Sequence, residues 1–169
     1  MPKQIKVELS VESIDRAIKE IQAERRRQEK AILELIDKMV AVGEDYAINA
    51  VGHVDTGETL ASITGYRNGN KGVIVAGGAA VWLEFGTGTL KNHYQHPPAQ
   101  GENANKIVRW GKYGDGYGDG SKYPEGWWYK DESGQSHHTK GIEANMFMWR
   151  TAQRLQELFP KMAKEVFEK

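Results

Sequence analysis

The chain has 169 residues, no cysteine, and 23 basic against 23 acidic residues, so its formal net charge is zero. This length suits a single domain with its own core, and the absence of cysteine excludes disulfide scaffolds, thiol nucleophiles and zinc sites built on sulfur. A neutral chain is not typical of proteins that mainly bind nucleic-acid phosphates. The sequence has no apolar run long enough to span a membrane. Because it also lacks the apolar start of a signal peptide, we expect synthesis to end in a cytoplasm.

The first predicted element is a short strand. Residues 4–9 alternate between polar and apolar side chains, with Ile5, Val7 and Leu9 on one side. A period of two residues is typical of a strand that buries one face.

A long helix is predicted next, with Ser10 or Ser13 as its N-cap. Apolar residues spaced alternately four and three apart form a stripe along one face of this helix. Arg25 and Gln28 interrupt the stripe, in a part of the sequence that is charged. The pattern predicts either one long helix with a solvated middle or two helices that break near residues 24–29. The stripe comprises Ile14, Ile18, Ile21, Arg25, Gln28, Ile32, Leu35, Met39, Val42 and Tyr46.

A β-hairpin and a short apolar element are predicted after this helix. A turn cluster at 52–57 ends the helix, and a strand is predicted over 60–66. The Asn- and Gly-rich residues 67–72 favour a hairpin turn, and 73–76 would form the returning strand. Residues 79–85 fit a short helix or a buried strand, because a short apolar run does not decide between them.

The stretch 89–141 differs from the rest of the chain in composition. It is rich in glycine, histidine and aromatic residues and poor in branched aliphatic residues, so it lacks the material for its own core. Because its tryptophans are large burial elements, we expect an inserted loop that is partly ordered on the body or on a neighbouring subunit. Helical spacing returns over 142–168, where Pro160 is expected to kink the helix or start a second one.

These elements predict one α+β domain over residues 1–169. A small antiparallel sheet of three to five strands would pack against the long N-terminal helix and a C-terminal helix. The insert could contribute a hairpin to the strand count.

No motif of an enzyme or a cofactor site is recognised. The sequence has no nucleotide-binding loop, no nucleophile elbow and no zinc-peptidase motif, and we therefore predict no catalysis and no cofactor. The Asp–Gly stretch 114–120 offers too few acidic oxygens for calcium. The best metal candidates, which a metal-dependent hydrolase would use, are His93, His96, His137 and His138. We interpret them as loop histidines, because a structural metal site needs a full ligand set.

Two further groups of residues could contact partners. The basic run 25–27 alternates with glutamates and is interpreted as a solvated helix face rather than a DNA contact. The insert offers a candidate protein interface in Trp110, Trp127, Trp128 and Tyr129. The same aromatic residues leave open a glycan- or cell-wall-binding module.

Three short segments stand out by their order and spacing. The first is Val54-Asp55-Thr56-Gly57 followed by Leu60 and Ser62-Ile63. The second runs from Ala80 and ends in Glu84-Phe85-Gly86-Thr87. The third is Asn145-Met146-Phe147-Met148 with Ala152. Together they resemble the head–tail joining or tail-completion proteins of tailed bacteriophages, whose third segment has a proline where this chain has Met146.

The resemblance covers residues 5–88 and 138–168 and implies a virion morphogenesis protein that is not an enzyme. Members assemble as rings, commonly hexamers, between the head connector and the tail tube or tail terminator, and leave a channel for DNA. The implied partners are copies of the chain itself and these neck proteins, without a membrane or a cofactor, and the implied location is the neck of the virion. The helix stripe and the aromatic insert are then candidates for the two contact patches of a ring.

The first motif also has a direct physical interpretation. Asp55 and Thr56 can bond their own following backbone, Gly57 can adopt a positive φ, and Ser62 can add a local hydrogen bond. These residues predict a fixed turn between helix and sheet.

The second motif contains a carboxylate in an apolar run. Phe85 can anchor the element, and Gly86 can then turn the chain sharply. Glu84 either points outward or, if buried, needs a salt bridge or a backbone group to cap.

Overall fold

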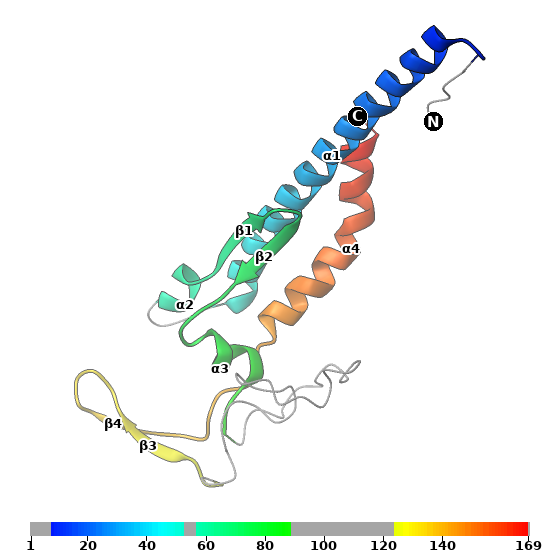
Figure 1. Cartoon of the computed structure of the whole chain (residues 1–169). Coiled ribbons are helices and arrows are strands. Elements are labelled where there is room, and N and C mark those ends of the chain that lie inside the picture. Colours follow the sequence, from blue (N-terminus) through cyan, green and yellow to red (C-terminus); the bar gives the residue numbers. More distant parts are fainter. Residues whose placement is uncertain (1–7, 53–56, 89–123, 169) are drawn as a thin grey trace.

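The computed structural model describes residues 8–52, 57–88 and 124–168. The two hairpins, β1–β2 and β3–β4, are antiparallel and belong to separate two-stranded sheets. The predicted α+β arrangement of a long N-terminal helix, a C-terminal helix and a small antiparallel sheet is confirmed (Figure 1). In chain order the elements are α1 (Val11–Val51), α2 (Glu58–Ala61), β1 (Thr64–Asn68), β2 (Lys71–Val75), α3 (Ala80–Phe85), β3 (Trp127–Lys130), β4 (Ser136–Thr139) and α4 (Phe147–Phe167).

The chain enters α1 through a cap rather than a strand. Of the strand predicted at 4–9, residues 4–7 lie outside the described part, and the prediction is wrong for Glu8 and Leu9. The backbone N–H of Glu8 donates to Ser13 Oγ at 2.9 Å, and that of Ser13 donates to Ser10 Oγ at 3.2 Å. These bonds bend the chain into the helix and leave Leu9 fully exposed.

A single helix of 41 residues follows, so the one-helix alternative is correct. Its charged middle continues as helix because oppositely charged side chains one turn apart pair on its surface. Arg25 Nε lies 2.8 Å from Glu29 Oε1, and Arg27 Nη2 lies 2.8 Å from Glu24 Oε1. Gly52, with φ of 77°, ends the helix.

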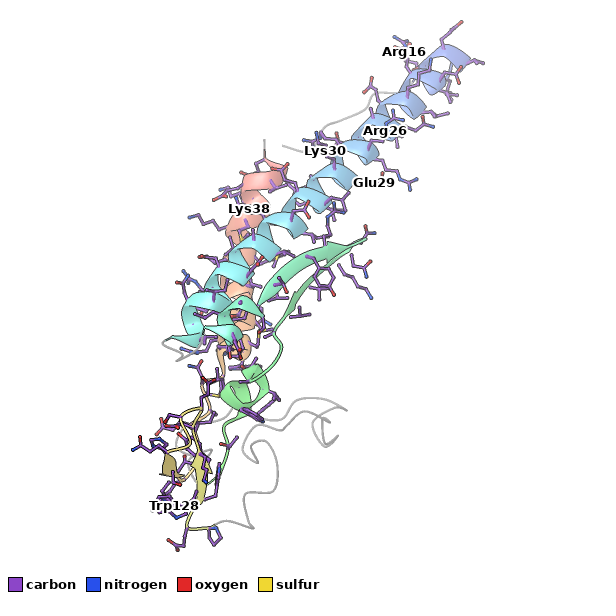
Figure 2. The ribbon with its side chains drawn as sticks, turned by 90° about the vertical axis from the view of Figure 1, so that its left-hand side faces the viewer. Arg16, Arg26, Glu29, Lys30, Lys38 and Trp128 are labelled. Atoms are coloured by element: carbon purple, nitrogen blue, oxygen red, sulfur yellow. The ribbon has the colours of Figure 1, made fainter. Side chains whose placement is uncertain are left out.

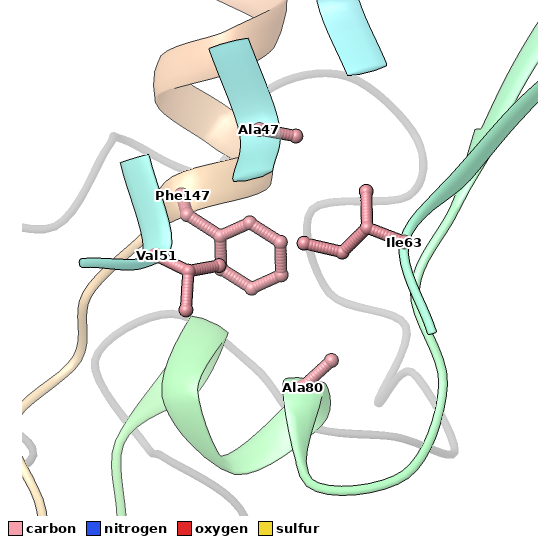
Figure 3. Packing of buried hydrophobic residues seen from close by; sticks show 5 residues of the cluster. All are labelled: Ala47, Val51, Ile63, Ala80 and Phe147. Atoms are coloured by element: carbon pink, nitrogen blue, oxygen red, sulfur yellow. The ribbon is translucent and has the colours of Figure 1, made fainter. Parts of the chain in front are cut away.

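The second half of α1 forms the spine of the molecule. α4 runs antiparallel to it, and β1–β2 packs on another side (Figure 1). One core cluster lies where α1 ends and α4 begins, and Phe147 at its centre is 0% exposed (Figure 3). This cluster comprises Ala47, Val51, Ile63, Ala80 and Phe147. A second, smaller cluster joins Leu35 of α1 to Met162 and Val166 near the end of α4.

Glycines let the hairpin approach α1 closely. A Cβ on Gly65 would lie 2.7 Å, and a Cβ on Gly72 2.6 Å, from a methyl of Val40. A side chain at either position would have to displace the side chain of Val40. The hairpin turn is formed by Gly69, with φ of 59°, and Asn70, in agreement with the predicted turn.

Two predicted boundaries differ from the structure, and one choice between alternatives is decided. The strand predicted at 60–66 is wrong in its first half, where Ser62 Oγ donates to Thr59 O at 2.7 Å and closes the short helix α2 instead. Of the two alternatives for 79–85, the short helix is confirmed, because Ala80–Phe85 form α3. The last helix begins five residues later than predicted and continues through Pro160 as one element, whose axis bends along its length (Figure 1).

The described part of the 89–141 stretch, from residue 124, contains the hairpin β3–β4. This hairpin lies at the opposite end of the molecule from the first turns of α1 (Figure 1). A tether holds it to the body: Thr87 N–H donates to Ile142 O at 2.9 Å, and Ile142 N–H donates to Thr87 Oγ1 at 3.1 Å.

Candidate functional site

Glu84 caps the N-terminus of α4 from inside the protein. Its side chain is 5% exposed, and its carboxylate oxygens accept the N–H groups of Met148 at 2.8 Å and Trp149 at 3.1 Å. These are helix N–H groups without a partner in their own helix, and the helix dipole there favours an anion. Of the roles expected for this carboxylate, backbone capping is confirmed and the outward orientation is wrong.

The same junction closes the C-terminus of α1. Arg150 donates to Ala50 O at 2.7 Å and to the side-chain oxygen of Asn145, and Asn145 Nδ2 donates to Val51 O at 3.2 Å. A cation beside the last carbonyls complements the negative end of the helix dipole. Neither side chain was predicted to have a role, since an arginine in an amphipathic helix and an asparagine before it carry no distinctive signal.

The junction also explains why α4 begins at Phe147. The backbone N–H of Asn145 donates to Leu83 O at 2.6 Å, and that of Met146 donates to Glu84 O at 3.2 Å. Because these groups bind the carbonyls of α3, the residues before Phe147 are not free to extend the helix. Met146 has φ of 54°, in the left-handed region where a proline cannot sit.

The remaining motif residues hold turns. Gly57 has φ of 69°, which confirms the predicted positive φ, whereas Asp55 and Thr56 lie outside the described residues. Ser62 makes the predicted local hydrogen bond and also accepts the N–H of Gly77 at 3.1 Å. The half-buried Leu60 packs against the core cluster around Phe147.

Phe85, Gly86 and Thr87 guide the chain from α3 toward the second hairpin. Phe85 is half-buried, and Gly86, with φ of 72°, donates its N–H to Trp82 O at 2.8 Å and ends the helix as predicted. Thr87 supplies both bonds of the tether to Ile142. The whole second motif is therefore structural, since it joins α3, α4 and the hairpin.

The hairpin β3–β4 presents aromatic side chains to solvent. Trp128 is 71% exposed and Tyr129 is about half exposed, while Trp127 is half-buried beside Gly88. Trp128 packs against His138, and Tyr129 stacks on His137 at a ring-centroid distance of 5.5 Å. Trp110, the fourth member of the candidate interface, lies outside the described residues.

His137 has a carboxylate partner that the sequence analysis overlooked. Its Nε2 lies 2.7 Å from Asp131 Oδ2, across the turn of the hairpin. The Ser133 hydroxyl, His137 and the Gln135 N–H lower the pKa of Asp131 to about 2. Within the described residues no three His, Asp or Glu side chains gather to hold a metal ion, and His93 and His96 lie outside that part of the chain.

The first half of α1 projects beyond the body. Figure 1 shows it extending past the end of α4, and Figure 2 shows charged side chains such as Arg16 and Arg26 along it. Its apolar stripe is nevertheless exposed: Ile14, Ile18 and Ile21 are between 44% and 56% accessible. The stripe was predicted to face a partner surface, and the described part of the chain supplies none for its first three positions.

Searches against known protein families, curated proteins and solved structures found no match. Within the described residues, no helix is long and apolar enough to cross a membrane. Exposed apolar and aromatic side chains lie at the projecting end of α1 and on the β3–β4 hairpin.

Proposed function

We propose that this chain is a structural subunit of a tailed phage that assembles into a ring at the neck of the virion, as a head–tail joining or tail-completion component. The observation that carries the proposal is the exposed apolar stripe of α1, at Ile14, Ile18 and Ile21. Three isoleucines on one helix face lose free energy by remaining in water, at about 25 cal/mol per Å² of apolar surface. An oligomer recovers that free energy by burying them.

The position of the two surfaces supports a ring rather than a closed pair. The first turns of α1, which carry the isoleucine stripe and the labelled Arg16, lie at one end of the molecule, and Trp128 lies at the other (Figure 2). A contact between two different patches is heterologous and closes into a ring when the rotation between subunits allows it. The resemblance of the three sequence motifs to neck proteins supports the location and the neighbours: the head connector on one side and the tail tube or terminator on the other, with DNA passing through the channel.

Native mass spectrometry and sedimentation over a range of concentrations test the ring. We expect a closed oligomer, with six copies as the first candidate, and its dissociation when Ile14 and Ile18 are both changed to Gln. The matched control changes Arg16 and Lys19, which lie on the charged side of the same turns, to Gln. A wild-type chain that stays monomeric when concentrated contradicts the proposal, as does equal loss of assembly in the two double variants.

Assembly alone does not locate the ring in a phage. The location is tested by stopping synthesis of the chain during infection and imaging the particles. We expect separate heads and tails, restored to joined particles by the wild-type chain in trans. Normal infectious particles would contradict a role in the neck.

The exposed Trp128 and Tyr129 favour one second candidate, a module that binds glycans or cell walls. Exposed aromatic faces beside polar groups suit sugar rings. Changing both residues to Ala should abolish binding to purified peptidoglycan if this candidate is correct, and it should reduce assembly instead if they form a subunit contact.

A further inference from the structure

One edge of strand β2 pairs with no other strand in the described part of the chain. Within the described residues its sheet has two strands, and β1 occupies one side. The pair next to the two-residue turn, Asn68 and Lys71, is a hydrogen-bonded pair, so bonding alternates from there and the N–H and C=O groups of Gly72 and Ile74 point away from β1. An edge of this kind is a template for another strand.

An apolar trough runs along this edge. One part of it, of about 290 Å³, is lined by Val40 of α1, by Gly72 and Ile74 of β2 and by Leu155 of α4. It continues past Ile74 into a larger hollow of about 690 Å³ bordered by α3. Because Gly72 has no side chain, a neighbouring strand can place apolar side chains close to α1 at this point.

The chain contains a segment of matching pattern. Residues 4–9 alternate, with Ile5, Val7 and Leu9 on one side and polar residues on the other. A third strand on β2 would place its apolar side in the trough and its polar side in water. Leu9, the last apolar member of this segment, is fully exposed in the structure.

The segment cannot reach the trough of its own chain. Gly72 lies against Ile36 of α1, about 39 Å along the helix from Ser10. Ile5 is five residues from Ser10, and even a fully extended chain covers only about 18 Å over that number. The trough that receives it must belong to another copy.

We propose that residues 4–7 of one copy, which precede the cap formed at Glu8, bind along β2 of the next copy as a third strand. The proposal rests on the self-assembly proposed above and supplies its contact: an arm at the projecting end of α1 enters a trough on the body of the neighbour. The arm and the trough are different surfaces, so the contact is heterologous, and each subunit binds one neighbour through its arm and another through its trough. Ile14, Ile18 and Ile21 follow directly on this arm and would be buried in the same contact.

Engineered cysteines test the pairing directly, because the chain has none of its own. Lys6→Cys in one preparation is mixed with Val73→Cys or Val75→Cys in another, since these side chains share the face opposite the trough. The control partner is Tyr66→Cys, which lies on the same face but on β1, two strands or about 10 Å from the added strand. We expect oxidation to give disulfide-linked mixed dimers with Val73→Cys or Val75→Cys and not with the control. The proposal is overturned if neither β2 variant gives mixed dimers, or if the control gives them in equal yield.

Sedimentation of two double variants separates this proposal from the ring itself. Ile5→Asn with Val7→Asn should raise the concentration for half-assembly at least tenfold, while Gln4→Asn with Lys6→Asn should leave it unchanged. Both should melt like the wild type when dilute, because the core clusters lie beyond residue 31. Assembly that is unaffected by the apolar change overturns strand donation and leaves the ring proposal standing, whereas a wild type that never assembles overturns both.

Discussion

Gly57 is the residue whose backbone most constrains the entry to the hairpin. It begins α2 in the left-handed region, and a Cβ there would meet nothing within 4 Å. The cost of a side chain at this position is therefore backbone strain alone, without a clash.

We expect Gly57→Val to lower the free energy of unfolding by about 1–3 kcal/mol, because a β-branched residue is poor at positive φ. Gly57→Asn is the control, since asparagine tolerates this conformation and should retain most of the stability. Urea denaturation monitored by circular dichroism measures both. Equal stability of the Val and Asn variants would show that the turn adopts another conformation.

Glu84 makes the second residue-level prediction. Glu84→Ala should cost about 1–3 kcal/mol of unfolding free energy, because it leaves the N–H groups of Met148 and Trp149 without their acceptor in a buried place. Glu84→Gln keeps one acceptor oxygen and should cost less. The outcome that contradicts the cap is an alanine variant that unfolds at the wild-type urea concentration.

Asp131 predicts an acid-sensitive hairpin. Its pKa falls from the ordinary 3.8 to about 2, first through the Ser133 hydroxyl and next through His137. A lowered pKa in the folded state means that the stabilisation is fully present above pH 3.8 and declines as the pH falls through 2. The carboxyl chemical shift of Asp131 should titrate near pH 2, and Asp131→Asn should remove the acid response of the β3–β4 amides. Titration of this carboxyl near pH 4 would contradict the hydrogen-bonded turn.

At the residue scale, the sequence allowed prediction where chemistry is local. Gly57, Gly86 and Ser62 act on their own neighbours, so their roles follow from the motif. Glu84 was singled out because a carboxylate in an apolar run needs a partner, but the partner lies on α4 and could not be named. The roles of Arg150 and Asn145 depend on the end of α1, nearly a hundred residues away in the chain, and no local pattern indicates them.

At the scale of elements, α1 is one helix with two environments. From residue 31 onward it packs against α4 and the β1–β2 hairpin, whereas its first half contacts solvent and is held by surface pairs such as Arg25–Glu29. Exposed pairs of this kind contribute only a few tenths of a kcal/mol each, and the first half lacks the tertiary packing that supplies most of the stability of helices in proteins.

Hydrogen exchange should therefore divide α1. In dilute, unassembled protein we expect the amides of residues 15–28 to exchange many times faster than those of 35–51, because local fraying frees the former and only global unfolding frees the latter. Nuclear magnetic resonance or mass spectrometry resolves the two halves. Uniform protection along the helix would mean that the first half is packed in the monomer.

The errors in the predicted elements share a physical cause. Helical spacing over 142–168 was correct in period, but the first residues are taken up by bonds to α3, so the helix begins at Phe147. The strand at 60–66 lost its first half because Ser62 closes a helical turn on Thr59. In both places a hydrogen bond outweighed the apolar pattern, and such bonds are not visible in periodicity.

At the scale of the whole molecule, the projecting helix makes the chain elongated. α1 alone is about 62 Å long, while a compact chain of 169 residues has a radius of gyration of about 15 Å. The prediction that the amphipathic stripe faces a partner surface is confirmed for its later part, around Leu35, Met39 and Val42, which packs in the protein's own core. Periodicity alone could not tell that Ile14, Ile18 and Ile21 remain exposed.

Small-angle X-ray scattering tests this shape. Dilute protein should give a radius of gyration clearly above 15 Å and a distance distribution with a long tail, because the first half of α1 stands away from the rest. A helix-breaking pair, Ala23→Pro with Arg26→Pro, should shorten that tail without changing the melting of the body. A compact profile for the wild type would mean that α1 folds back on itself.

The close approach of the two backbone segments at Gly88 and Gly141 has a consequence for engineering. A Cβ on Gly141 would lie 2.1 Å from Thr87 O, and one on Gly88 would lie 2.2 Å from Lys140 O, so the outgoing and returning backbones touch where they leave the body. Everything between these two glycines is thus a cassette with adjoining ends. We expect that it can be replaced by a short linker, a foreign loop or an affinity tag while α3 and α4 keep their places, because its two ends already adjoin.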